Sequence, residues 1–124
     1  MKLNPDCVRD CLLAIEDLPL ASDYHEEEIR DSEYLKNYLE DDITYSLIQL
    51  IDAGFLQGEV KRFMRGSSIN IKKITWDGHS FLENIRPEST WNKTKSTISE
   101  KVGSASLSVF SQVAAAMINA KLGL

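Results

Sequence analysis

The chain begins with a segment in which apolar residues recur at helical spacing. Asn4-Pro5-Asp6 predicts a helix start, because Asn is a good N-cap, Pro fits the first helical position and an acid suits the positive end of the helix dipole. We expect the helix to end near Leu18, before Pro19. Its core-facing positions are Val8, Cys11, Leu12 and Ile15.

Two further helices are predicted before Gly54. Residues 21–29 are acidic and are expected to hold a short strand, after which Ser32 caps a second helix that carries Tyr34, Leu35, Tyr38 and Leu39. Asp41 or Asp42 is expected to cap a third helix, which Gly54 ends through a left-handed turn. The apolar face of this third helix consists of Ile43, Leu47, Leu50 and Ile51.

Residues 57–74 show the pattern of a β-hairpin. One strand runs through Val60 and Phe63, the turn is expected at Gly66-Ser67, and the return strand holds Ile69, Ile71 and Ile74. Helices followed by a hairpin form a winged helix, with the hairpin as the wing. The sequence thus predicts a mainly α fold with a small antiparallel hairpin (α+β), in which residues 1–86 form a winged helix-turn-helix domain.

The rest of the chain predicts helices. Thr75 is expected to cap a fourth helix that buries Phe81, Leu82 and Ile85 and ends before Pro87. A fifth helix would place Trp91, Ile98 and Val102 on one face, and Gly103-Ser104 permits a break before the last helix. Residues 87–124 are therefore predicted to be a helical extension for packing or oligomerisation, attached to the core by Trp76 and Trp91.

Several runs of residues resemble a known family. They are Leu50-Ile51-Asp52-Ala53-Gly54-Phe55-Leu56, the segment from Ile74-Thr75-Trp76-Asp77-Gly78-His79 to Arg86, Trp91-Asn92-Lys93-Thr94-Lys95, the first ten residues and residues 102–107. Over nearly the whole chain these runs are similar to small proteins of unknown function that bacterial phages and prophages carry. The resemblance implies a winged-helix core and a bacterial or phage origin, and it implies no activity. A looser resemblance is to winged-helix transcription regulators.

Charge is distributed unevenly along the chain. The formal net charge is -5, but residues 1–56 hold 4 basic and 14 acidic side chains, whereas residues 57–124 hold 10 basic and 5 acidic ones. This polarity favours contact between oppositely charged halves, within or between protomers, or a basic surface that binds an anion. A third interpretation is that both surfaces are merely solvated.

The sequence argues against both a disulfide framework and a membrane span. Cys7 and Cys11 are four residues apart on one helix, which predicts two buried thiols rather than a disulfide framework. No secretory signal is recognised, so a cytoplasmic location is expected. Residues 102–120 carry no charge and have the length of a membrane span, yet their serines, alanines and Asn119 favour a packed or oligomerising helix.

DNA reading by a winged helix requires a third helix that can approach the bases. The helical wheel turns Tyr45, Gln49 and Asp52 outward, and Gln49 could pair with adenine while Tyr45 contacts a phosphate. Asp42 and Asp52 oppose this docking, because the helix has acids and no Lys or Arg.

The wing is the opposite case. It holds five cations within thirteen residues, which predicts a contact with phosphate that begins at the wing. The alternative is that cations on an edge strand discourage pairing with other chains. The five cations are Lys61, Arg62, Arg65, Lys72 and Lys73.

No motif in the chain indicates catalysis. The sequence has no Gly-rich phosphate loop, no HExxH and no nucleophile elbow, and its two histidines are His25 and His79. The cysteines and histidines match no compact zinc module, so neither a metal nor another cofactor is expected.

The last helix supplies a possible partner surface. Its apolar stripe, at steps of three and four, is a candidate oligomer interface and consists of Leu107, Phe110, Ala114 and Met117. The first hypothesis is therefore a non-enzymatic, prophage-type winged-helix protein that self-associates through its C-terminal helices and binds a protein partner. The second is a DNA-binding transcriptional regulator that uses the basic wing, and the third is peripheral membrane attachment through residues 102–120.

Overall fold

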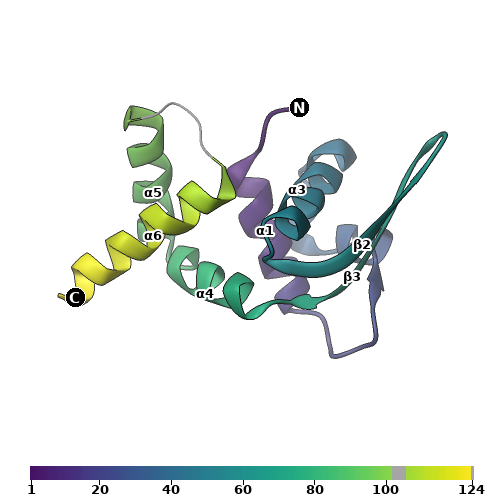
Figure 1. The fold of residues 1–124 in the computed structure, drawn as a ribbon, viewed down its shortest axis with the longest axis horizontal. Coiled ribbons are helices and arrows are strands. Elements are labelled where there is room, and N and C mark those ends of the chain that lie inside the picture. The colour runs from purple at the N-terminus through teal and green to yellow at the C-terminus, as the bar shows by residue number, and fades with distance from the viewer. Residues whose placement is uncertain (102–105, 124) are drawn as a thin grey trace. The chain divides into compact units, whose positions relative to one another are not determined.

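The computed structural model describes residues 1–101 and 106–123, without the side chains of residues 100 and 101. The chain forms two compact units, Met1–Gly78 (unit 1) and His79–Leu124 (unit 2). Most of the described residues are helical, and a three-stranded antiparallel sheet lies in unit 1 (Figure 1). The prediction of a mainly α fold with a small antiparallel β part is confirmed.

Helix α1 (Pro5–Glu16) begins as its sequence predicts. The Asn4 side chain accepts a hydrogen bond from the Cys7 backbone N–H at 3.2 Å, and Pro5 occupies the first turn. The core-facing side is buried and extends over Cys7, Val8, Cys11, Leu12, Leu13, Ala14 and Ile15.

The segment after α1 holds the short strand predicted within residues 21–29, but otherwise differs from the prediction. Strand β1 (Tyr24–His25) is followed at once by a short helix α2 (Glu26–Arg30), and the expected second helix after Ser32 is only a 3₁₀ turn, η1 (Glu33–Leu35). Ser32 does cap that turn, through a hydrogen bond from the Tyr34 N–H. Helix α2 forms because three acids lie at its positive end and Glu28 accepts a hydrogen bond from the His25 N–H at 3.2 Å.

Helix α3 (Glu40–Asp52) begins earlier than predicted. Its N-cap residue is Leu39, so the prediction of a cap at Asp41 or Asp42 was wrong, and both acids lie in the first turn, where the helix dipole favours them. Ile43, Leu47 and Leu50 are buried, as expected. Gly54 ends the helix with a φ of 81°.

Strands β2 (Leu56–Phe63) and β3 (Gly66–Ile74) form the predicted hairpin, and β3 lies between β1 and β2. The turn is not at Gly66-Ser67. Phe63 pairs with Gly66, so Met64 and Arg65 make the turn and both predicted turn residues lie in β3. Ile69, Ile71 and Ile74 are buried, which fixes the face that the hairpin turns toward the core of unit 1.

Helix α4 (Trp76–Ile85) is capped by Thr75, whose hydroxyl accepts a hydrogen bond from the Gly78 N–H at 3.0 Å. The same hydroxyl donates to the Gly54 carbonyl at 2.6 Å, which ties the start of α4 to the end of α3. Trp76 is 85 % exposed, so the prediction that it attaches the extension to the core was wrong.

Helices α5 (Glu88–Lys101) and α6 (Leu107–Leu122) pack on each other in unit 2. The rings of Trp91 and Phe110 lie 5.7 Å apart at this contact. Val102 and the predicted break at Gly103-Ser104 lie outside the described residues. Within the described parts of the chain, no helix combines the length and the apolar character that a bilayer crossing requires.

Candidate nucleic-acid interface

The hairpin of β2 and β3 gathers the five cations that the sequence singled out. We call residues 56–74 the basic hairpin. Its far half projects from the rest of unit 1 (Figure 1), and every side chain of residues 61–67 is exposed. The five exposed cations are Lys61, Arg62, Arg65, Lys72 and Lys73.

Strand alternation explains how the hairpin can be buried and charged at once. Val60 lies opposite Ile69, whose side chain is buried, so the neighbouring positions Lys61 and Phe63 face outward. Arg62 lies on the same side as Val60, but beyond the edge of the core, and is exposed. The core therefore extends only under the half of the hairpin that lies away from its turn.

A register shift between Gln57 and Gly58 places two lysines at one point of the hairpin. Ile71 pairs with Gly58 and Lys73 pairs with Gln57, which leaves Lys72 as an extra residue of β3. Lys72 and Lys73 are both exposed, while Ile71 and Ile74 on either side are buried. The irregularity thus turns two consecutive cations toward solvent.

Most of this positive charge is not neutralised by the protein. The Lys72 ammonium lies 4.0 Å from a Glu59 carboxylate oxygen. Within residues 1–101 and 106–123, the structure gives no ion pair to the other four cations of the basic hairpin. They can therefore bind an external anion without first breaking a salt bridge.

The tip of the hairpin is apolar as well as basic. Phe63 is 64 % exposed and Met64 is fully exposed, and Arg62 and Arg65 flank the pair in the chain. Sequence reasoning did not single out Met64, because it placed the turn two residues later. The signal in the sequence that could have found it is the apolar pair Phe63-Met64 between Arg62 and Arg65.

Helix α3 offers little to a polyanion. Tyr45 and Gln49, the predicted groove contacts, are both only partly exposed, and Asp52 is fully on the surface. The first turn adds the acids Glu40, Asp41 and Asp42. Acids therefore lie at both ends of α3, and their repulsion of phosphates opposes docking by this helix.

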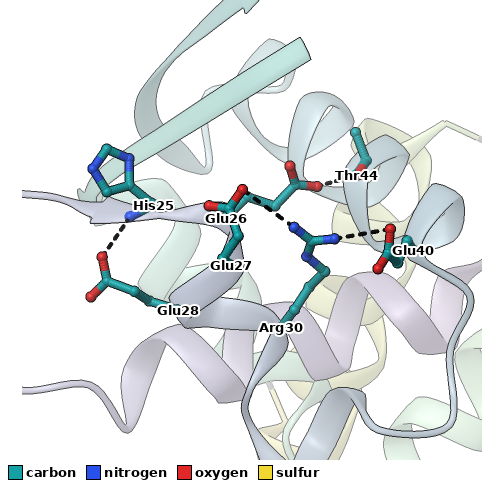
Figure 2. Close-up of polar contacts among 7 residues, drawn as sticks. All are labelled: His25, Glu26, Glu27, Glu28, Arg30, Glu40 and Thr44. Carbon is teal, nitrogen blue, oxygen red and sulfur yellow. Dashed lines mark hydrogen bonds and ion pairs between the residues drawn. The ribbon is translucent and has the colours of Figure 1, made fainter. Parts of the chain in front are cut away.

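Arg30, which contacts the start of α3, does not compensate for these acids. Figure 2 shows its guanidinium between two carboxylates, 3.1 Å from Glu40 and 3.5 Å from Glu27. In the same view, Glu26 of α2 accepts a hydrogen bond from the Thr44 hydroxyl of α3. Arg30 therefore stabilises the contact between α2 and α3, and its charge is already balanced.

The predicted oligomer stripe is covered within the chain. Leu107, Phe110 and Ala114 are buried, and Met117 is half-buried with its sulfur accepting a hydrogen bond from the Thr94 hydroxyl at 3.4 Å. The stripe packs on α5 through Trp91 and Thr94. An oligomer built on these residues would require α6 to leave α5.

Two of the open cavities among the described residues lie away from the basic hairpin. One, of about 390 Å³, borders Arg30, whose charge Glu27 and Glu40 already balance. The other, of about 540 Å³, lies between α5 and α6 beside Lys93 and Lys121.

The two thiols are free and buried in α1. A hydrogen bond with Cys11 lowers the pKa of Cys7, against the effect of burial, and the same contact together with burial raises the pKa of Cys11. Both histidines are exposed. In the part of the chain that the structure describes, no three metal-ligating side chains gather as a metal site would require.

Comparison with known proteins defines the family. Residues 2–104 match the family described as "Hypothetical protein (DUF2513)", and the chain belongs to it. An uncharacterised protein of Haemophilus influenzae (strain ATCC 51907 / DSM 11121 / KW20 / Rd) is 29% identical over 125 residues, covering 98% of this chain and 99% of that protein. No solved structure gives a significant match.

Proposed function

We propose that this protein is a non-enzymatic winged-helix protein that binds nucleic acid through the basic hairpin, with α3 held outside the groove. The order of elements in unit 1 supports the winged-helix assignment, because α1, β1, α2 and α3 precede β2 and β3. The observation that carries the binding proposal is the group of five exposed cations on one projecting hairpin, four of them without an ion pair in the described residues.

The charge of unit 1 dictates which side would meet a polyanion. The basic hairpin, residues 56–74, has 5 basic and 1 acidic side chains, a net charge of +4, whereas the rest of residues 1–78 has 4 basic and 15 acidic ones, a net charge of -11. A duplex would be attracted to the hairpin and repelled elsewhere on the unit. Binding is therefore electrostatic and hairpin-first, and we expect little discrimination among base sequences.

Titration of the full chain into a fluorescently labelled random-sequence duplex tests this proposal. We expect measurable binding at about 50 mM salt that falls steeply by about 200 mM. The variant Lys61→Gln/Arg62→Gln/Lys73→Gln removes three cations without ion pairs. Since each phosphate contact contributes about 0.9 to the slope of log K against log salt, loss of three should lower that slope by about 3.

The matched control is Lys2→Gln/Lys93→Gln/Lys121→Gln, which removes the same charge from exposed positions outside the hairpin to which the described residues give no ion pair. This control should bind like the wild type. The proposal is wrong if the wild type does not bind the duplex at low salt, or if the two triple variants lose the same affinity. Thermal unfolding of each variant shows whether the fold is kept.

The same charge distribution supports a second candidate, head-to-tail self-association. The +4 hairpin of one copy complements the -11 remainder of unit 1 in another. Light scattering of the protein alone should then show association that weakens with salt and is lost in the hairpin variant but kept in the control. A monomer at every salt concentration would exclude this candidate.

Other expectations from the sequence stay predictions. They are the phage or prophage origin, the cytoplasmic location, the protein partner and self-association through the C-terminal helices. Gln49→Ala tests the role of α3. This variant should leave duplex affinity unchanged if α3 stays outside the groove.

A further inference from the structure

We propose that the hairpin tip inserts Phe63 and Met64 as an apolar wedge between stacked base pairs of duplex DNA, and thereby bends the duplex. This inference rests on the proposed binding through the basic hairpin and adds a specific action to it.

The tip has the composition that a wedge requires. Phe63 is the last residue of β2, and Met64 is the first residue of the two-residue turn, so both apolar side chains lie at the end that projects farthest along the hairpin. Neither is covered by the protein, since Phe63 is 64 % exposed and Met64 fully exposed. Proteins that kink DNA insert such side chains, Phe and Met among them, between base steps.

The surroundings of the tip leave room for a base pair on either side of the wedge. Phe63 lies opposite Gly66, which has no side chain, and the next residues of β3 are Ser67 and Ser68. A narrow two-stranded ribbon with small side chains at its end can enter a groove of the duplex. The flanking residues Arg62 and Arg65 are exposed and placed to neutralise the phosphates next to the insertion point.

The distribution of charge favours a duplex over an anionic membrane. A membrane would be met by the tip alone, because Lys72 and Lys73 lie six and seven residues along β3 from Gly66, roughly 20 Å away at the rise of a strand. A duplex presents phosphates over such a distance, so it can engage the tip and these two lysines together. The cations along the hairpin therefore fit DNA better than a flat surface.

The experiment uses a duplex of about 20 base pairs that carries a donor and an acceptor fluorophore at opposite ends. Binding of the full chain should increase energy transfer, because a wedge bends DNA by about 20 to 90°. A duplex with a central flexible TA step should bend more than one with an A-tract at its centre.

The decisive variant is Phe63→Ser/Met64→Ser, which removes the wedge and keeps every cation. It should still bind with the salt dependence of the wild type, with an affinity about tenfold to a hundredfold lower, and it should leave energy transfer unchanged. The control is Leu20→Ser, which removes another fully exposed apolar side chain from unit 1. The control should bind and bend the duplex like the wild type.

The outcomes separate this inference from the proposal on which it rests. Wild-type binding without a change in energy transfer, or equal bending by the Phe63→Ser/Met64→Ser variant, overturns the wedge and leaves hairpin binding intact. Absence of any wild-type binding to the duplex overturns both. A third arm measures co-sedimentation with vesicles of equal parts phosphatidylcholine and phosphatidylglycerol, and vesicle binding that requires Phe63 and Met64 without DNA bending overturns the wedge in favour of a membrane surface.

Discussion

Glu26 of α2 accepts a hydrogen bond from the hydroxyl of Thr44 on α3, although Glu26 is almost fully buried. A buried carboxylate requires such a partner, because desolvation without a hydrogen bond is costly. The contact joins two residues eighteen positions apart in the chain, and with the Arg30–Glu40 ion pair it holds α2 against the start of α3 (Figure 2).

Replacement of Thr44 by Val should therefore destabilise the protein. The variant keeps the shape of the side chain and leaves the buried Glu26 without the hydroxyl donor, at an expected loss of about 1–3 kcal/mol in the free energy of unfolding. Thr44→Ser keeps the hydroxyl and should lose less. Urea denaturation measures both, and equal stability of Thr44→Val and the wild type would show that the contact contributes nothing.

Gly78 should not tolerate a methyl group. A Cβ at this position would lie 2.1 Å from the Phe55 carbonyl oxygen and 2.8 Å from Ile74 Cγ2, so Gly78→Ala must displace α4 or the end of β3. Overpacking of this kind costs about 1–3 kcal/mol or more. Thermal unfolding measures the loss.

Gly54 supplies the matched comparison for Gly78. Nothing lies within 4 Å of a Cβ there, so the cost of Gly54→Ala arises only from its φ of 81° and should be about 1–2 kcal/mol. Gly54→Asn should lose less, because Asn tolerates this conformation. A Gly78→Ala variant more stable than Gly54→Asn would contradict the close approach of α4 to Phe55.

Tyr38 should make stability fall at alkaline pH. Burial and the hydrogen bond that its hydroxyl donates to Asp10 at 2.6 Å raise the pKa of Tyr38 well above its ordinary value of 10.0. The folded state therefore keeps a proton that the unfolded state releases, so this contribution is complete below pH 10 and is lost as the pH rises above it. Denaturation at about pH 9 and at about pH 11 should show a larger fall in the free energy of unfolding for the wild type than for Tyr38→Phe.

If Tyr38→Phe shows the same decline of stability with pH as the wild type, Tyr38 does not couple its ionisation to folding.

Phe110→Ala distinguishes packing within the chain from an oligomer interface. Phe110 is buried against Trp91, and truncation of a buried Phe costs about 3–5 kcal/mol. Because the contact lies within one chain, the loss should not depend on protein concentration. Gln112→Ala, at an exposed position of α6, should change little. A loss that varies with protein concentration would instead place Phe110 between copies.

Local signals made much of the fold predictable. The start of α1 depends on Asn4 and Pro5, the end of α3 on Gly54 and the start of α4 on Thr75, and each acts within a few residues of its own position. The hairpin was predictable from its buried isoleucines for the same reason.

The errors arose where distant residues decide the structure. Helix α2 is not predictable from the sequence, which does not show that Glu26 is buried against Thr44. Gly66-Ser67 is a good local turn signal, whereas the pairing of Phe63 with Gly66 belongs to a register that begins at Leu56 and Ile74. Helix α3 begins at Glu40, before the predicted caps Asp41 and Asp42, because acids within the first turn also interact favourably with the helix dipole.

The candidate site was predictable in its charges and not in its contacts. The five cations of the hairpin could be read from the sequence, whereas the exposure of Arg62, which lies on the same side as Val60, could not be read from alternation. That Lys72 approaches Glu59, and that Arg30 is occupied by Glu27 and Glu40, required coordinates. The periodicity of α6 identified its apolar face and could not show that α5 covers it.

The register shift leaves one extra residue in β3, so that Lys72 and Lys73 are both exposed between two buried isoleucines. Regular alternation would put one of Lys72 and Lys73 on the same side as Ile71, whereas here Ile71 and Ile74 both remain buried. Removal of one of these lysines by deletion, rather than by substitution, would restore a regular ladder without turning any isoleucine outward. The strand could thus gain or lose a positive charge over time while its hydrophobic side stayed the same.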